Sequence, residues 1–303
     1  MPSSLCPIRR EAAVRGVQTY YKRVGYVLIE GADGVMRRYG DSELDMRFSG
    51  EKVGTVYKEF EVGILGLSAS TINELTVWDK AKATAASRRI EVYAGYADGG
   101  IDHPLFSGII IEAMPTNPPE MWMNFKCINM NGGAVGDWRK NELFEDAAIG
   151  EVFGWIAEDC GFGGKWRWES SRDPTDRISF VMSSNARDNA ERFAHAFDLI
   201  VFEDGGIMYA RDARMQFDTP KEPVVQVNQD TGMLALGNVT LAGATIKTRL
   251  SDRAMFGSWI YLTSKIVPKA NGYYIVVRKK HVGHLRGEEW YTELQTIRKD
   301  ARV

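Results

Sequence analysis

The sequence is poor in the residues on which metal sites and many active sites depend, with three cysteines and four histidines among 303 residues. Cys6, Cys127 and Cys160 are odd in number and form no C-x-x-C pair, which argues against a disulfide framework and against a zinc site. His281 and His284 are three residues apart, so in a strand they would point to opposite faces and share no metal. We interpret both as part of a solvated hairpin loop and expect no metal and no cofactor.

An excess of one charge and a long hydrophobic run are also missing. The chain has 38 Lys and Arg against 40 Asp and Glu, a formal net charge of -2 and a pI of about 6.2. A strongly basic surface for nucleic acid is therefore not expected. No apolar run reaches membrane-spanning length, and the N-terminus has no continuous apolar stretch like that of a signal peptide. We expect a protein without a membrane segment that is made in the cytoplasm.

Known catalytic patterns are absent, because the sequence has no G-x-S-x-G, H-E-x-x-H or EF-hand loop. Adjacent acidic pairs such as Glu158-Asp159 are more typical of helix ends and turns than of a glycosidase dyad. Trp166 and Trp168 could stack on a sugar, but an edge strand of a small domain explains them better. We expect no enzyme, and a cell-wall hydrolase and a carbohydrate-binding β module remain as alternatives.

The first half of the chain has mostly β patterns. Residues 1–25 carry two prolines and a basic group at Arg9, Arg10 and Arg15 without a hydrophobic period, so we interpret them as an extended arm that is ordered only against a neighbour. Thr71 and Glu74 have the spacing of a capping box and predict a short helix there. Period-two alternation and β-branched or aromatic residues predict strands over 26–29, 44–48, 57–62, 90–96, 106–111 and 121–128.

The middle of the chain has a different character. Helical patterns over 151–160 and 185–197 are followed by a tight hairpin over 199–210. Gly161 is placed to end the first helix, and Ser183 or Ser184 to cap the second. We therefore predict a small α+β domain over 136–220, inserted between β domains over 26–135 and 221–303.

The last part of the chain predicts a β-hairpin. Residues 273–277 and 290–297 are rich in β-branched and aromatic residues, and a polar loop with glycines separates them. Asn271-Gly272 in front of the first strand is a turn signal, since both residues tolerate positive φ.

The two β-rich parts resemble each other at an offset of 168 residues. At this offset Tyr93 aligns with Tyr261, Phe106 with Tyr274, and Trp122 with Trp290. The helix predicted near residue 71 would fall on 239–246, where Gly243 is unfavourable for a helix. The alignment predicts two similar β domains in which Trp122 and Trp290 have a packing role.

Short motifs in both β parts resemble a known family. Leu67-Ser68 with Thr71, then Ile90-x-Val-x-Ala-Gly-Tyr96 and Leu105-Phe106-x-Gly108, are similar to the first tube-like domain of phage baseplate hub proteins. The ending, Asn271-Gly-x-Tyr-x-Val and Trp290-Tyr-Thr-x-Leu294, is similar to that of hubs from Mu-like and other contractile-tailed phages, the late control protein D class. Gly232-Met-Leu-Ala-Leu-Gly237 departs from the family in lacking a proline, which puts the start of the last domain in doubt.

The resemblance implies a fold and a function. It implies a β-rich α+β chain with two tail-tube-like β-barrel domains, in which the residues with structural packing roles are Tyr93, Phe106, Gly108, Trp122, Tyr261, Gly272, Tyr274 and Trp290. It also implies a homotrimeric structural hub that joins the hexameric tail tube to the trimeric central spike. The partners would be the tail tube protein, the central spike protein and other baseplate proteins. DNA and the tape-measure protein would pass through the channel without specific binding, in a virion baseplate assembled in the host cytoplasm.

Overall fold

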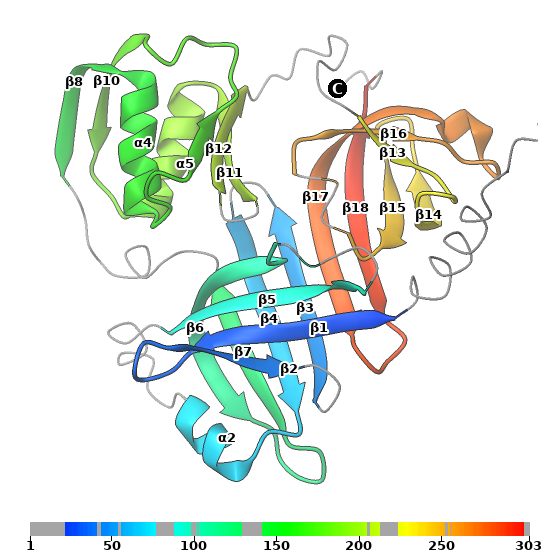
Figure 1. The fold of residues 1–303 in the computed structure, drawn as a ribbon. Helices are drawn as coiled ribbons and strands as arrows, with labels where there is room; N and C mark the ends of the chain where they lie inside the picture. Colours follow the sequence, from blue (N-terminus) through cyan, green and yellow to red (C-terminus); the bar gives the residue numbers. More distant parts are fainter. Residues whose placement is uncertain are drawn as a thin grey trace, which may run out of the picture.

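The β-rich parts before residue 128 and after residue 224 pair into one sheet of 13 strands (Figure 1). The structure, a computed structural model, describes residues 22–40, 44–53, 56–76, 88–97, 101, 103–128, 141–204, 207–212, 224–251, 254 and 256–299. Residues 1–21 of the expected arm lie outside these ranges, as do the predicted boundaries near 135 and 220. Within the described residues, no helix has both the length and the apolar character needed to cross a bilayer.

The first unit of the sheet contains the strands that precede residue 128. In the sheet its strands follow the order β3, β4, β7, β6, β5, β1 and β2. Their bounds are β1 Arg23–Glu30, β2 Met36–Gly40, β3 Asp45–Val53, β4 Val56–Leu65, β5 Arg89–Tyr96, β6 Phe106–Pro115 and β7 Trp122–Ile128. All neighbours in this unit are antiparallel.

The second unit repeats this arrangement. Its strands follow the order β14, β15, β18, β17, β16 and β13, so β14 takes the place of β3 and β13 that of β1. The pair of β13 with β16 is parallel, whereas β1 pairs with β5 antiparallel. The bounds are β13 Val225–Val227, β14 Met233–Val239, β15 Gly243–Arg249, β16 Trp259–Leu262, β17 Gly272–His284 and β18 Trp290–Arg298, with the 3-10 helix η2 at Pro268–Ala270.

The strand registers show where the 168-residue offset holds. Val92 pairs with Phe106 and Ile260 pairs with Tyr274, so the two pairs are related by that offset. Closer to the N-terminal side the offset changes: Ile64 pairs with Met123, and the equivalent partner of Tyr291 is Arg249, 185 residues after Ile64.

A helix in the first unit accounts for this change. The connection from β4 to β5 contains α2 (Ala69–Leu75), whereas nine residues separate β15 from β16. Residues 239–246 accordingly hold the end of β14 and the start of β15, not a helix. The helix near residue 71 was predicted, but its cap is Ser68, whose Oγ accepts a hydrogen bond from Thr71 N–H at 3.2 Å.

β17 joins the two units into one sheet. Its first part, Gly272 to Ile275, pairs with β16, and its second part, Arg278 to His284, pairs with β3 of the first unit. A register shift between Val276 and Arg278 separates the two parts, and β18 follows β17 along the other side. The polar stretch from 278 to 284, predicted as a loop, is therefore strand.

The sheet does not close on itself. In the described residues the hydrogen-bonded order is open, from β14 at one end to β2 at the other, so no closed barrel is found. The prediction of a β-rich chain with few helices is confirmed, while the arrangement as two separate barrels is not.

Residues 142–212, called the α/β segment below, form three layers (Figure 1). β8 pairs with β10 on one side, the helices α4 and α5 lie in the middle, and the sheet β11-β12-β9 lies on the other side. Asn185, not Ser183 or Ser184, caps α5, because its side chain accepts a hydrogen bond from Asp188 N–H. The bounds are β8 Glu142–Ala148, α4 Ile149–Asp159, β9 Trp166–Trp168, β10 Arg177–Met182, α5 Ala186–Ala196, β11 Leu199–Asp204 and β12 Ile207–Asp212.

Each part has its own group of buried side chains, and a small joint connects the α/β segment to the sheet. The separate cores are built around Phe60 in the first unit, Phe153 in the α/β segment and Tyr274 in the second unit. At the joint, Phe202 of β11 lies 5.6 Å from Phe256, measured between ring centroids. A buried ion pair joins Lys52 of β3 to Glu203 of β11, with Nζ and Oε2 3.2 Å apart.

Candidate functional site: the charged face of the sheet

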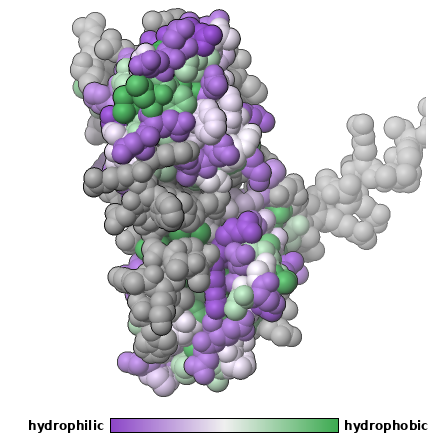
Figure 2. Space-filling view, turned by 90° about the vertical axis from the view of Figure 1, so that its left-hand side faces the viewer, coloured by the Kyte–Doolittle hydropathy of each residue, from purple (hydrophilic) through white to green (hydrophobic). Residues whose placement is uncertain are grey.

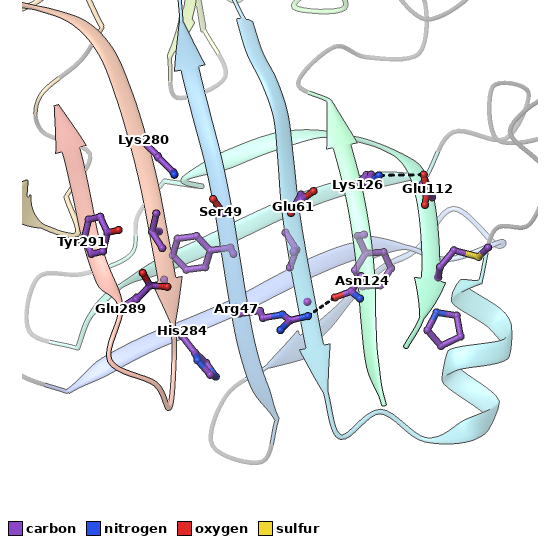
Figure 3. Close-up of a pocket in the computed structure, with 18 residues that line it drawn as sticks. Arg47, Ser49, Glu61, Glu112, Asn124, Lys126, Lys280, His284, Glu289 and Tyr291 are labelled. Atoms are coloured by element: carbon purple, nitrogen blue, oxygen red, sulfur yellow. Dashed lines mark hydrogen bonds and ion pairs between the residues drawn. The ribbon is translucent and has the colours of Figure 1, made fainter. Parts of the chain in front are cut away.

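An open groove of about 670 Å³ crosses the face of the sheet where the two units meet (Figure 3). It extends over β6, β7, β4, β3, β17 and the start of β18. The polar and aromatic side chains that Figure 3 labels along it are Arg47, Ser49, Glu61, Glu112, Asn124, Lys126, Lys280, His284, Glu289 and Tyr291.

The polar character of this face follows from strand alternation. In β3, Arg47 and Ser49 point to the groove, while the neighbouring Phe48 is only 3% exposed and packs in the first core. Val62 of β4 and Phe125 of β7 are buried in the same core. Because one face is fully occupied by the core, the other is free to carry charge.

Charges on the groove face alternate in sign from strand to strand. Glu112, Lys126 and Glu61 are successive cross-strand partners on β6, β7 and β4. A second row, one further step across the sheet, consists of Lys247, Glu293, Lys280 and Glu51 on β15, β18, β17 and β3. The ion pairs in these rows are 3.7 Å between Lys126 Nζ and Glu112 Oε2, and 3.9 Å between Lys247 Nζ and Glu293 Oε2. Opposite charges on adjacent strands cancel, so the face presents a weak net field.

One end of the groove is held by a polar cluster around Trp122. The Arg47 guanidinium lies over the Trp122 ring, 4.4 Å from its centroid, and donates to Asn124 Oδ1 at 3.2 Å. His284 of β17 contacts the same indole edge-on, with centroids 5.7 Å apart, and its Nε2 lies 2.9 Å from Asp45 Oδ2. Trp122 therefore links both units at this end of the groove.

The other aromatic residues predicted from the repeat lie away from the groove. Trp290 is 4% exposed in the first core and meets Phe48 edge-on, and Phe106 stacks on Phe60 with centroids 4.4 Å apart. Tyr274 is fully buried, and its hydroxyl donates to the Ala270 carbonyl at 2.7 Å. Burial raises the pKa of the Tyr274 hydroxyl.

The remaining predicted residues occupy strand pairs and a close approach. Tyr93 stacks on Tyr26 with centroids 4.7 Å apart, and burial raises the pKa of its hydroxyl. Tyr261 meets Tyr273 edge-on. Gly108 lies so close to β7 that an added Cβ would be 2.1 Å from the Ile128 carbonyl oxygen, and Gly272 has a φ of +149° at the start of β17. The repeat thus identified packing positions and, apart from Trp122, no residue next to the groove.

A buried polar cluster behind β17 escaped the reading of the sequence. His281 is fully buried, its Nδ1 lies 2.9 Å from Thr292 Oγ1, and its Nε2 has no hydrogen-bond partner. Burial lowers the pKa of His281, and the neighbouring Lys279 and Lys52 lower it further. The signal that could have placed it is period two, because Lys279 and His281 alternate with groove-facing Lys280 and Val282.

The groups that might support the alternative functions have structural partners. Trp166 and Trp168 both meet Phe153 edge-on, at 5.7 and 5.8 Å, and β9 is an edge strand as predicted. Cys127 and Cys160 are buried, which raises the pKa of both thiols, in the case of Cys160 to about 12. No cluster of three or more potential metal ligands occurs in the described part of the chain.

Comparison with a family model gives a match over most of the chain. Residues 27–296 match the model of a family described as baseplate hub gp41. No curated protein sequence is similar enough to this chain to count as a match.

Several solved structures share the fold. A tail protein from Neisseria meningitidis MC58 is 10% identical, with a TM-score of 0.60 over 90% of this chain and 96% of the other. The 43 kDa tail protein of prophage MuSo2 from Shewanella oneidensis is 7% identical, with a TM-score of 0.56 over 91% and 98%. E. coli c3393, a type VI secretion component described as similar to the T4 tail proteins gp27 and gp5, is 10% identical, with a TM-score of 0.57 over 84% and 73%.

Proposed function

Since the chain belongs to the baseplate hub gp41 family of phage tail proteins, we propose that three copies form a ring joining the tail tube to the central spike. The observation that carries this proposal is the repeated strand order of the two units. Two similar units in each of three copies would place six similar units around one axis. Such a ring matches sixfold symmetry on the tube side and threefold symmetry on the spike side.

The groove face is well suited to the inside of such a ring. Its alternating rows, with Glu61, Lys126 and Glu112 in one of them, hold nearly equal numbers of positive and negative groups. A basic lining would bind phosphates and release counterions, so it would hold DNA in a salt-dependent way. On this proposal the face lines the channel, and DNA and the tape-measure protein pass it without specific binding.

The proposal assigns a structural role and no reaction. The partners are further copies of the chain, the tail tube protein, the central spike protein and other baseplate proteins. The site of action is the virion baseplate, after assembly in the host cytoplasm. Support for the first point comes from the groove, where Arg47 and His284 already contact Asn124 and Asp45.

The ring is tested by the mass of the purified chain, alone and with its spike and tube proteins. We expect a species of three times the 34.0 kDa of the chain in native mass spectrometry, and a threefold projection in electron micrographs. A stable monomer that binds neither the spike nor the tube protein would refute the ring.

The channel role is tested by reversing charge in one row. Particles assembled with Glu61→Lys/Glu112→Lys should eject DNA more slowly than wild type, and added salt should restore the rate because it screens phosphate binding. Asp230→Lys/Glu158→Lys makes the same change of charge at exposed positions outside the groove and should leave the rate unchanged. Equal ejection rates in both variants would exclude this face as the lining.

A further inference from the structure

The two-stranded sheet of the α/β segment presents an apolar face to solvent. Leu143 of β8 and Val181 of β10 are direct cross-strand partners, 57% and 45% exposed. Beside them Trp155 of α4 is 39% exposed, with its ring 6.4 Å from that of Phe144. Figure 2 looks onto this side of the molecule and shows a hydrophobic patch in its upper part, bordered by hydrophilic residues. An exposed apolar patch with a polar rim is typical of a docking surface.

The same sheet has backbone edges to which a further strand can be added. In the described residues β8 and β10 pair only with each other, so each strand has one edge outside the ladder. An extended peptide can add to such an edge through main-chain hydrogen bonds, while alternate side chains contact the face of the sheet.

The charge of this sheet restricts what can bind there. β8 carries three acidic residues, Glu142, Glu145 and Asp146, and the two strands together contain one basic residue, Arg177. The occupant should therefore be an extended segment with positive charge and regularly placed apolar residues.

Residues 1–21 of the chain have this composition. They contain three arginines, Arg9, Arg10 and Arg15, and one acidic residue, Glu11. Apolar side chains are spread among them at Leu5, Ile8, Val14 and Val17. Fully extended, such a segment reaches about 70 Å, roughly three times the length of a seven-residue strand.

The point where this segment begins favours a second copy as its target. It ends next to Arg23, whose Nη1 donates to the His284 carbonyl at 3.0 Å, at the turn between β17 and β18. That turn and the sheet β8-β10 lie on opposite sides of the chain in Figure 1. We propose that residues 1–21 of one copy bind as an added strand along the β8-β10 sheet of another copy. The proposal needs two copies in contact, but not the ring proposed above.

The test uses the full chain and its natural cysteines. Cys127 and Cys160 are buried, so a maleimide photocrosslinker is directed to Cys6. An equal mixture of ¹⁵N-labelled and unlabelled chain is illuminated, and crosslinked peptides are identified by mass spectrometry. We expect crosslinks from Cys6 to residues 142–148 or 177–182, with labelled peptides joined to unlabelled ones. Cys6→Ser is the control for misdirected label.

Two pairs of variants separate this contact from general association. Leu143→Asp should reduce the crosslink yield by about tenfold or more because it removes apolar contact, whereas Leu241→Asp, at a leucine 91% exposed on the second unit, should not. Glu145→Lys should also reduce the yield, and combination with Arg9→Glu/Arg10→Glu should restore part of it.

Several outcomes would overturn the proposal. They are crosslinks only within one copy, crosslinks elsewhere or none at all, equal yields for Leu143→Asp and Leu241→Asp, and crosslinks at this sheet only when another phage protein is added. Native mass measured on the same samples distinguishes the two proposals, since a threefold mass without the crosslink refutes the strand and leaves the ring.

Discussion

Trp290 is a residue whose neighbours make its contribution measurable. It is 4% exposed, meets Phe48 edge-on with centroids 5.5 Å apart, and its Nε1 is buried without a hydrogen-bond partner. We predict that Trp290→Ala lowers the free energy of unfolding by about 3 to 5 kcal/mol, because it opens a cavity in the first core.

A second variant distinguishes packing from the indole N–H. Trp290→Phe keeps a ring beside Phe48 and removes the unsatisfied donor, so its cost should stay below about 2 kcal/mol. Both values follow from thermal or denaturant unfolding. An unchanged melting temperature in Trp290→Ala would contradict the packing role.

His281 should make stability depend on pH. Its pKa in the folded chain is below the usual 6.5, so its contribution is complete above about pH 6.5 and declines as the pH falls below that value. The decline is at most about 1.4 kcal/mol per pH unit for one group. Carboxylates with lowered pKa, such as Asp33 and Asp173, act nearer pH 4 and are separated from this window.

The measurement compares melting at pH 7.0, 6.0 and 5.0. His281→Gln should flatten the slope between pH 6.5 and 5, whereas His284→Gln, on the same strand but partly exposed, should keep it. The hypothesis fails if the wild type and His281→Gln lose stability in parallel.

At the scale of elements, glycine determines how closely β6 and β7 approach. A Cβ at Gly108 would meet the Ile128 carbonyl oxygen at 2.1 Å, and backbone cannot move aside as a side chain can. We predict that Gly108→Ala costs about 1 to 3 kcal/mol. Gly164→Ala is the matched control, because a Cβ there has nothing within 4 Å, and its melting temperature should match wild type.

β17 shows how far local pattern predicted the elements. Its first part was predicted from Tyr273 to Val277, and the partner strand from Trp290, in agreement with the structure. The continuation through Lys279 and His281 was wrong because buried polar residues look like loop when their cover is unknown. That cover comes from β3, more than 220 residues away in the chain, and no local period contains it.

The repeat was informative for the same physical reason that it was incomplete. Its 168-residue offset placed Trp122 and Trp290 at the starts of β7 and β18, since paired strands keep their register. It failed at residues 239–246 because α2 lengthens one connection and not the other. The groove could not be predicted, since its rows combine strands from both ends of the sequence.

At the scale of the whole molecule, the α/β segment is joined to the sheet through a buried ion pair. Lys52 and Glu203 are 1% and 7% exposed in their side chains. Glu203→Gln takes the carboxylate from a buried ammonium and should cost about 3 to 5 kcal/mol, whereas Lys52→Met/Glu203→Gln should cost less. Asp230→Asn breaks an exposed pair with Lys265 and should change stability by less than about 1 kcal/mol.

Limited proteolysis with thermal unfolding measures this joint. In Glu203→Gln we expect faster cleavage between the α/β segment and the sheet at a temperature where wild type resists. If the double variant is as unstable as Glu203→Gln, the lost charge balance is not the cause.

β17 also has a mechanical consequence. Because one strand crosses both units, a pull along its axis loads the ladders to β3, β16 and β18 together, and their hydrogen bonds resist in shear. A pull across the sheet would instead peel one ladder bond by bond. A baseplate that is jolted when its tail contracts would transmit axial load through such a strand as through a stiff beam, with no hinge between the two units.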